Sequence, residues 1–167
     1  MHDELTKVDL EKMRAEIEYR TRELRPQLIA EVQRTRAFGD LSENYEYKTA
    51  KQEMNRNNSR IRYLERMIKT ARVIDTASDV DTVGLFDRVT LYLEEDDEEQ
   101  TIELVTTLRQ DPRKGLVSKE SPLGRAVLGR RVGDRALVQV TESYSYYATI
   151  RAIEKGEDDE SLDISKY

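Results

Sequence analysis

The sequence has no cysteine and only one histidine, His2, among its 167 residues. Without cysteine the chain can form no disulfide, no thiol nucleophile and no cysteine-based zinc site. A Ser–His–Asp triad or a histidine-ligated metal would have to be built on His2, at a chain end of the kind that is usually poorly ordered. We therefore expect any metal chemistry to use oxygen ligands, which favours Mg²⁺ or Mn²⁺.

Long apolar runs are also missing from the sequence. No stretch approaches the roughly 18 apolar residues of a membrane span, and the first residues show no basic segment leading into an apolar one. Charged residues make up 37% of the chain and hydrophobic residues 37%, against about 25% and about 45–50% in typical globular domains. We expect a cytoplasmic protein with no membrane contact, made of two small domains or of one small core with a long exposed element.

The first half has the periodicity of two amphipathic helices. Residues 7–36 predict one helix, which Pro26 should kink or reset near Arg25, and after Gly39 a second helix runs to about residue 74. In each, apolar residues recur at steps of three, four or seven. They are Leu10, Met13, Ile17, Leu24, Leu28 and Val32 in the first, and Tyr47, Ala50, Met54, Ile61, Leu64, Ile68 and Ala71 in the second. Two such stripes joined by a short break predict an antiparallel coiled-coil hairpin about 45 Å long.

The two predicted helices also carry two notable polar features. Symmetric pairing about the turn places Asn57 or Asn58 near Leu24, which we expect to fix the register of the helices at some cost in stability. The second helix also carries a basic surplus, with only Glu65 opposing Arg56, Arg60, Arg62, Arg66, Lys69 and Arg72. This face is either solvated and offset by acidic residues of the first helix, or it steers the protein toward phosphate or an acidic surface.

From about Val80 the period changes to two, which predicts strands around one short helix. The expected strands begin at Phe86 and resume at Thr101, on either side of the acidic run 94–99, which we interpret as a solvated hairpin loop. Ser121 and Pro122 predict the cap and the first residue of the short helix, and two further strands are expected over 135–140 and 146–153.

The fold class is therefore predicted to be α+β, with a helical hairpin followed by a small mixed domain. The predicted ranges are 1–76 for the hairpin, 77–82 for a linker, 83–156 for the globular domain and 157–167 for an acidic, disordered tail.

The break between the helices holds two carboxylates, Asp40 and Glu43, three residues apart. One interpretation is structural: Asp40 caps the second helix and Glu43 reaches back in a capping-box-like arrangement. The other is functional: both carboxylates project from the hairpin end and hold a divalent cation, in a weak Mg²⁺ site that needs further ligands from elsewhere. The spacing taken alone favours the structural interpretation but leaves both open.

The segment from Gly39 to Lys51, GDLSENYEYKTAK, resembles the tip signature of the bacterial transcript cleavage factors GreA and GreB. The resemblance continues in Arg25-Pro26, in the run 71–75 and in the segment 117–129, VSKESPLGRAVLG. It implies an FKBP-like C-terminal domain that binds bacterial RNA polymerase, and a coiled coil that enters the polymerase secondary channel. Such a factor stimulates the polymerase's own Mg²⁺-dependent cleavage of backtracked nascent RNA, and is not itself an enzyme.

The same resemblance implies roles for particular residues. Asp40 and Glu43 are then the catalytic carboxylates, sharing a Mg²⁺ ion with the polymerase active centre, with Asp40 on the metal and Glu43 orienting metal or water. The implied contacts to the 3′ end of the RNA are Arg36, Lys48 and Lys51. The implied supports of the tip are Asn44 and Tyr47, and the implied polymerase-binding segment is Ser121, Pro122, Leu123 and Gly124.

Three departures from the family's pattern leave open a paralogue with altered polymerase preference, and two alternatives to the cleavage role also remain. Tyr45 stands where the family usually has alanine, the segment 141–147 is rich in tyrosine, and the acidic tail looks like an extension. One alternative is a Gre-like factor that occupies the polymerase channel and inhibits without stimulating cleavage. The other is a non-enzymatic coiled-coil scaffold, in which Asp40 and Glu43 only cap. In each case we expect a monomer.

Overall fold

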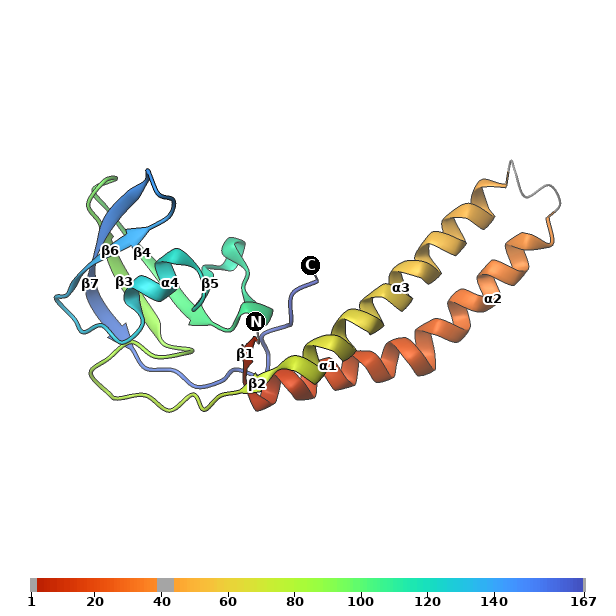
Figure 1. Ribbon diagram of the computed structural model, residues 1–167, viewed down its shortest axis with the longest axis horizontal. Coiled ribbons are helices and arrows are strands. Elements are labelled where there is room, and N and C mark those ends of the chain that lie inside the picture. Colours follow the sequence, from red (N-terminus) through yellow and green to blue (C-terminus); the bar gives the residue numbers. More distant parts are fainter. Residues whose placement is uncertain (1–2, 39–43, 167) are drawn as a thin grey trace. The chain divides into compact units, whose positions relative to one another are not determined.

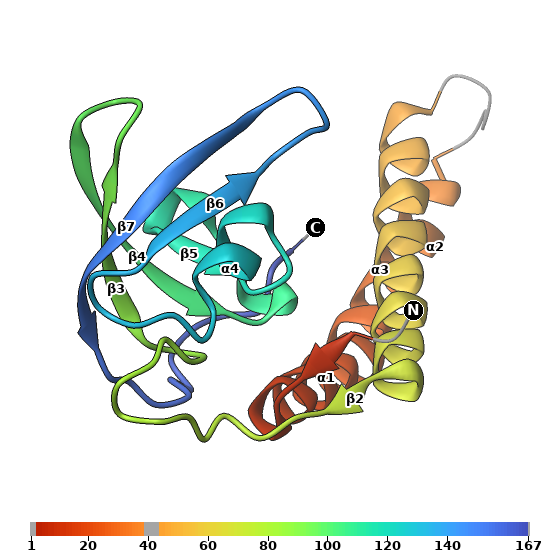
Figure 2. The same ribbon diagram turned by 60° about the vertical axis from the view of Figure 1, so that its left-hand side comes forward.

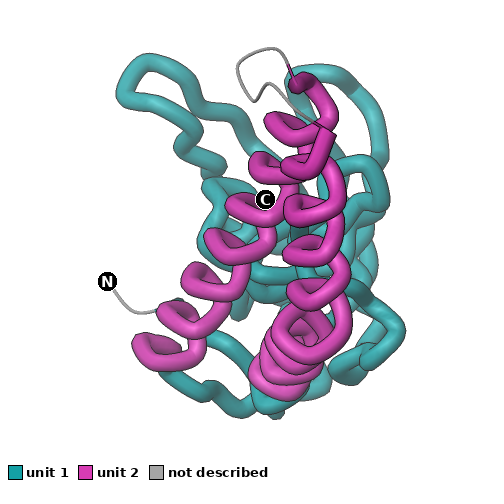
Figure 3. Tube along the Cα trace, turned by 90° about the vertical axis from the view of Figure 1, so that its right-hand side faces the viewer, with its two compact units in different colours: residues 1, 3–9, 72–167 teal, residues 2, 10–71 magenta. Residues whose placement is uncertain are grey.

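The computed structural model of the protein describes residues 3–38 and 44–166. The chain divides into two compact units (Figure 3). The hairpin unit spans residues 10–71, and the globular unit combines residues 3–9 with the chain from Arg72 onward. The contacts thus group both ends of the predicted hairpin range, 1–76, with the globular unit, because a short strand near the N-terminus pairs with one that follows the second helix.

The helical hairpin predicted from the sequence is confirmed (Figure 1). Its first arm consists of α1 (Lys7–Tyr19), a π-helical turn (Arg20–Leu24) and α2 (Arg25–Arg36), and its second arm is α3 (Tyr45–Thr70). The π turn ends two residues before Pro26, close to Arg25, where we expected a kink or reset. Proline has no N–H to donate, and its ring would clash with the carbonyl four residues earlier in a regular helix, so a wider turn relieves the clash.

The hairpin unit has a thin apolar core. The buried apolar residues lie on the two predicted stripes and are Leu10, Met13, Ala50, Ile61 and Leu64. Asn57, on the stripe of α3 between Ala50 and Ile61, is also buried. The apolar core is therefore interrupted halfway along the rod.

The globular unit is built on a five-stranded mixed sheet of order β5-β4-β3-β7-β6 (Figure 2). Its strands are β3 (Arg88–Leu93), β4 (Glu98–Val105), β5 (Leu116–Ser118), β6 (Arg135–Gln139) and β7 (Ser145–Glu154). Only the β4–β5 pair is parallel. The loop in the acidic run is shorter than the predicted 94–99, because Glu98 and Glu99 belong to β4 and pair with Leu93 and Tyr92. Two 3₁₀ turns (Thr107–Arg109 and Pro112–Lys114) and α4 (Pro122–Val127) complete the unit.

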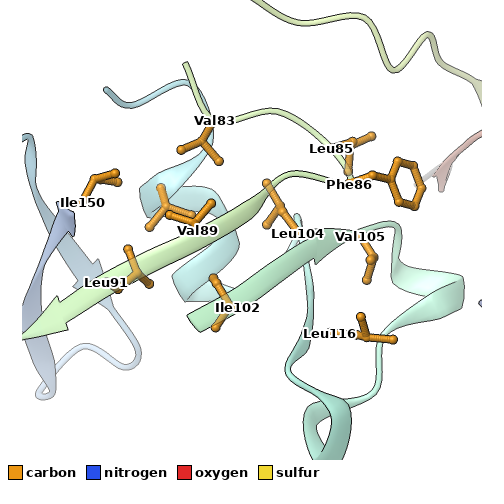
Figure 4. Packing of buried hydrophobic residues seen from close by; sticks show 11 residues of the cluster. Val83, Leu85, Phe86, Val89, Leu91, Ile102, Leu104, Val105, Leu116 and Ile150 are labelled. Atoms are coloured by element: carbon orange, nitrogen blue, oxygen red, sulfur yellow. The ribbon is translucent and has the colours of Figure 1, made fainter. Parts of the chain in front are cut away.

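One face of this sheet carries the core, as the period of two predicted. Val89 and Leu91 of β3 are fully buried and alternate with more exposed neighbours. On β4, Ile102 and Leu104 are buried on either side of the more exposed Glu103, and Val105 at the end of the strand is buried as well. Figure 4 shows these side chains with their neighbours. The remaining members of the cluster are Val83, Leu85, Phe86, Val105, Leu116, Val127 and Ile150. This arrangement is a mixed-sheet domain, and its likeness to the FKBP fold stays a prediction.

Both ends of the chain are tied into the globular unit. β1 (Glu4–Leu5) pairs in parallel with β2 (Arg72–Val73). Thr6 and Asp9 form a capping box at the start of α1: each side chain accepts a hydrogen bond from the other's backbone N–H. The fully buried Arg109 then donates to Asp9 at 2.7 Å and to Thr6 at 3.1 Å.

Residues 157–166 of the acidic tail contact the rest of the globular unit, and the disorder predicted for the tail stays a prediction. Arg109 also pairs with Asp158 and donates to the carbonyl of Asp159. Further along, Leu162 packs against the core, and the N–H of Ser165 donates to the carbonyl of Leu108. The tail's carboxylate therefore has a buried cation to pair with, which composition alone does not reveal.

Candidate functional site at the tip of the hairpin

The second arm of the hairpin begins with a well-formed cap. Asn44 is the N-cap of α3, and its side-chain oxygen accepts a hydrogen bond from the N–H of Tyr47 at 3.0 Å. Its side-chain N–H₂ donates to the carbonyl of Thr35 at 2.6 Å, near the end of α2. One side chain thus satisfies a free amide at the start of one helix and also binds a carbonyl at the end of the other, which accepts the backbone N–H of Phe38 as well.

This geometry overturns the capping interpretation of the two tip carboxylates. The helix starts at Tyr45, so the capping position belongs to Asn44 and not to Asp40. The third helical position, from which a capping-box carboxylate would reach back, is Tyr47 and not Glu43. Asp40 and Glu43 themselves lie outside the described residues.

Arg34, in the last turn of α2, contacts several side chains close to the tip. It forms two hydrogen bonds with Glu31, at 2.6 and 2.9 Å, and lies 3.7 Å from the carboxylate of Glu46 on α3. Its guanidinium also stands over the ring of Phe38, 5.1 Å from the centroid. The hydrogen bond from Arg34 holds the pKa of the exposed Glu31 carboxyl below its usual value. Sequence analysis missed this cluster, although the spacing of three between Glu31 and Arg34 is typical of a helical ion pair.

The basic residues singled out from the sequence are exposed on both sides of the tip. Arg36 ends α2, and Lys48 and Lys51 lie in the first two turns of α3. Lys48 lies over the ring of Tyr45, 5.5 Å from its centroid, and Lys51 lies over that of Tyr47 at 6.0 Å. Tyr45 is 79% exposed, whereas Tyr47 is half-buried on the stripe of α3.

A groove runs between the arms just behind the tip. Its lining mixes acidic and basic groups with Tyr45, and its residues are Glu31, Arg34, Tyr45, Glu46, Thr49, Ala50 and Glu53. Within residues 3–38 and 44–166, no three acidic or histidine side chains come together as a metal site would need. The carboxylates of Asp40 and Glu43 are hard oxygen donors of the type that Mg²⁺ prefers, and two of them leave most of its coordination to other ligands.

The Ser121–Gly124 segment starts α4 as the sequence predicted. Ser121 is the N-cap, its hydroxyl oxygen accepts from the N–H of Gly124 at 3.0 Å, and Pro122 is the first helical residue. Gly124 is buried so tightly that a Cβ there would lie 2.0 Å from the carbonyl oxygen of Ser118. Leu123 packs against the core, and of the four residues Pro122 is the exposed one. Two exposed apolar side chains after the helix, Leu128 and Val132, were missed by the sequence analysis.

Comparison with models of known protein families identifies the family of this chain. A family model described as "Transcription elongation factor, N-terminal" matches residues 4–73. A second, described as "Transcription elongation factor, GreA/GreB, C-term", matches residues 77–155. The chain belongs to the GreA/GreB family of transcription elongation factors.

Individual GreA relatives align over most of the chain. The transcription elongation factor GreA of Geobacillus kaustophilus is 40% identical over 136 residues, which is 81% of this chain and 86% of that protein. The GreA of Mesomycoplasma hyopneumoniae is 37% identical over 84% of this chain and 88% of that protein. Among solved structures, GreA factor homolog 1 (Gfh1) of Thermus thermophilus is 26% identical and matches with a TM-score of 0.42, covering 93% of this chain and 100% of that one.

Every helix within the described ranges is too short or too polar to cross a membrane.

Proposed function

We propose that this GreA/GreB family member stimulates the cleavage of backtracked nascent RNA by bacterial RNA polymerase, in the cytoplasm and as a monomer. The observation that carries the proposal is the cap of α3. Because Asn44 is the N-cap of α3 and also binds the end of α2, Asp40 is not needed as the cap of this helix. A functional role then becomes the better explanation of Asp40 and Glu43.

In this proposal the chain supplies an incomplete ligand set and the polymerase completes it. Asp40 would hold a Mg²⁺ ion together with carboxylates of the polymerase, and Glu43 would orient the metal or the attacking water. When bound, the ion stabilises the charge that develops on the attacking and leaving oxygens. The factor is then not an enzyme by itself, since the active centre belongs to its partner.

The exposed cations around the tip fit a role in positioning RNA. Arg36, Lys48 and Lys51 all point charge into solvent on the two arms, where a phosphate backbone could approach. Tyr45, largely exposed and covered on one side by Lys48, offers a ring for stacking on an unpaired base. These contacts would hold the 3′ end of the nascent RNA beside the two carboxylates.

The globular unit would dock on the polymerase near the start of α4. Pro122 is exposed there, and Leu128 and Val132 add exposed apolar surface after the helix. Leu123 and Gly124 would support this region from below, because they pack inward.

A stalled, backtracked elongation complex with end-labelled RNA tests the proposal. Wild type should shorten the RNA from its 3′ end in a Mg²⁺-dependent reaction, whereas Asp40→Asn should lose nearly all of this effect and Glu43→Gln part of it. Glu46→Gln is the matched control, because Glu46 is an exposed carboxylate in the first turn of α3, and it should behave as wild type.

Each other outcome has a definite meaning. If Asp40→Asn and Glu43→Gln both cleave like wild type, the proposed roles of the two carboxylates are wrong. If wild type binds the polymerase and slows nucleotide addition without any cleavage, the protein is a channel-binding inhibitor. If wild type does not bind the polymerase at all, the scaffold alternative is favoured.

A further inference from the structure

Halfway along the rod, the two arms are joined by buried polar groups. Arg60 of α3 is only 2% exposed and binds both carboxylate oxygens of Glu16 on α1, at 2.7 and 3.3 Å. Arg20 donates to the same carboxylate at 2.9 Å. Burial would raise the pKa of Glu16, but the hydrogen bonds from Arg60 and Arg20 outweigh it and lower that pKa. The carboxylate is therefore held in its charged form between two guanidinium groups.

The same cluster also forms hydrogen bonds with the π turn. Asn57 is 3% exposed, accepts a hydrogen bond from Arg20 at 3.0 Å and donates to the Arg20 carbonyl at 3.1 Å. That carbonyl also accepts the backbone N–H of Arg25, which closes the π turn. The next residue of α3, Asn58, accepts from the side chain of Arg25 at 3.2 Å. Two adjacent asparagines thus bind the arginines at both ends of the turn.

Between this cluster and the tip, the apolar core is too small to define the register of the two arms. Among the described residues between Asn57 and the tip, the only buried side chains are Ala50 on α3 and Thr35 on α2. On the base side, Ile61 and Leu64 are buried on α3, and Leu10 and Met13 on α1. Small and polar contacts define the register of two helices poorly, whereas a buried hydrogen-bonded asparagine defines it well because a slip leaves it unpaired.

We propose that Asn57 and Arg20, backed by Glu16 and Arg60, form a register lock that positions the tip of the hairpin. The lock allows only one register between α2 and the part of α3 that lies toward the tip. It thereby fixes the position of the tip relative to the rest of the hairpin. The four residues are positioning residues, because they lie away from the tip. The consequence for RNA cleavage rests on the proposed function, but the lock itself does not.

The absence of native cysteine allows a direct test of the register. Nitroxide labels on Gln33→Cys and Gln52→Cys, both exposed, report the tip-side half by double electron–electron resonance, and labels on Arg14→Cys and Glu65→Cys report the base side. Both pairs should give a single narrow distance distribution in the otherwise wild-type chain. Adding Asn57→Leu should split or shift the tip-side distribution and leave the base-side one unchanged. Asn55→Leu, on the exposed side of α3, is the matched control and should change neither.

Cleavage by the unlabelled variants gives the second readout. Asn57→Leu should lower RNA cleavage by about ten- to hundred-fold, since a misplacement of about 1 Å costs that much, whereas Asn55→Leu should retain it. A tip-side distribution that stays narrow and unshifted in Asn57→Leu overturns the proposal, even if the melting temperature falls. If wild type itself does not stimulate cleavage, the proposed function fails and the distance distributions still decide the lock. Should Asn57→Leu not fold, Arg20→Met removes the same pair from the other arm and is judged by the same distances.

Discussion

Replacing Arg109 by methionine should destabilise the globular unit strongly. Arg109 and Asp9 are both fully buried and lie 2.7 Å apart, and Arg109 also binds Thr6, Asp158 and the carbonyl of Asp159. Methionine fills similar space but leaves the Asp9 carboxylate buried without its cation. Removing one partner of a buried ion pair typically costs about 3–5 kcal/mol.

Urea unfolding followed by far-ultraviolet circular dichroism measures this loss. With a slope of about 2 kcal/mol per molar urea, the midpoint for the globular unit should fall by about 2 M. Arg113→Met is the matched control, because Arg113 is exposed, and it should change stability by no more than about 0.5 kcal/mol.

A second substitution separates the charge from the packing. Asp9→Asn removes the negative charge but keeps an oxygen that can accept the N–H of Thr6. The double variant Arg109→Met/Asp9→Asn should therefore recover at least half of the stability lost in Arg109→Met. If Arg109→Met lowers stability by less than about 1 kcal/mol, or if the two substitutions simply add, the buried charge pair is not what holds this region.

Three further predictions concern single contacts. Asn44→Ala should destabilise the hairpin unit by about 1–2 kcal/mol in thermal unfolding, since it removes the cap of α3 and the donor to Thr35; an unchanged melting temperature would contradict the assigned cap. Gly124→Ala should cost about 1–3 kcal/mol, because its Cβ would lie 2.0 Å from a backbone oxygen, and a variant as stable as wild type would refute that close contact. The lowered pKa of Glu16 means that its contribution is present above the ordinary value of 4.5 and is lost as the pH falls through the folded value. Urea titrations at decreasing pH should therefore show a smaller acid loss in Glu16→Gln than in wild type, and equal losses would contradict the assignment.

The regular elements could be predicted from the sequence because each follows a local period. The stripe from Tyr47 to Ile68 predicts α3, and the alternation around Val89 and Leu91 predicts β3, since burial of one face imposes those spacings. Ser121 and Pro122 likewise predicted the start of α4, because a cap is a local interaction. These features depend only on near neighbours in the chain.

The start of α3 could not be predicted, because the tip offers several residues able to cap. Asp40, Ser42 and Asn44 are all good capping residues, and their order in the sequence does not choose among them. Asn44 is distinguished by its second hydrogen bond, to Thr35 on the other arm. A contact across the hairpin thus decided a question that had seemed local.

The contacts of the acidic tail could not be predicted for a similar reason, over a longer separation in the sequence. Arg109 joins Asp9, 100 residues earlier, to Asp158, 49 residues later. An acidic tail is usually disordered because it cannot bury its charges. Here the buried Arg109 provides the opposite charge, and no local sequence pattern around Arg109 predicts that it pairs with the tail.

The polar interior of the hairpin fits the requirements of a long two-helix rod. Two arms with solvent on most sides share only a narrow seam, so they bury few apolar side chains and gain little specificity from them. Polar pairs such as Arg20–Asn57 lose much when they are mismatched, so they can set one register where the apolar seam is thin. A factor that acts through residues at the end of such a rod depends on that register, since an error at mid-length displaces everything beyond it.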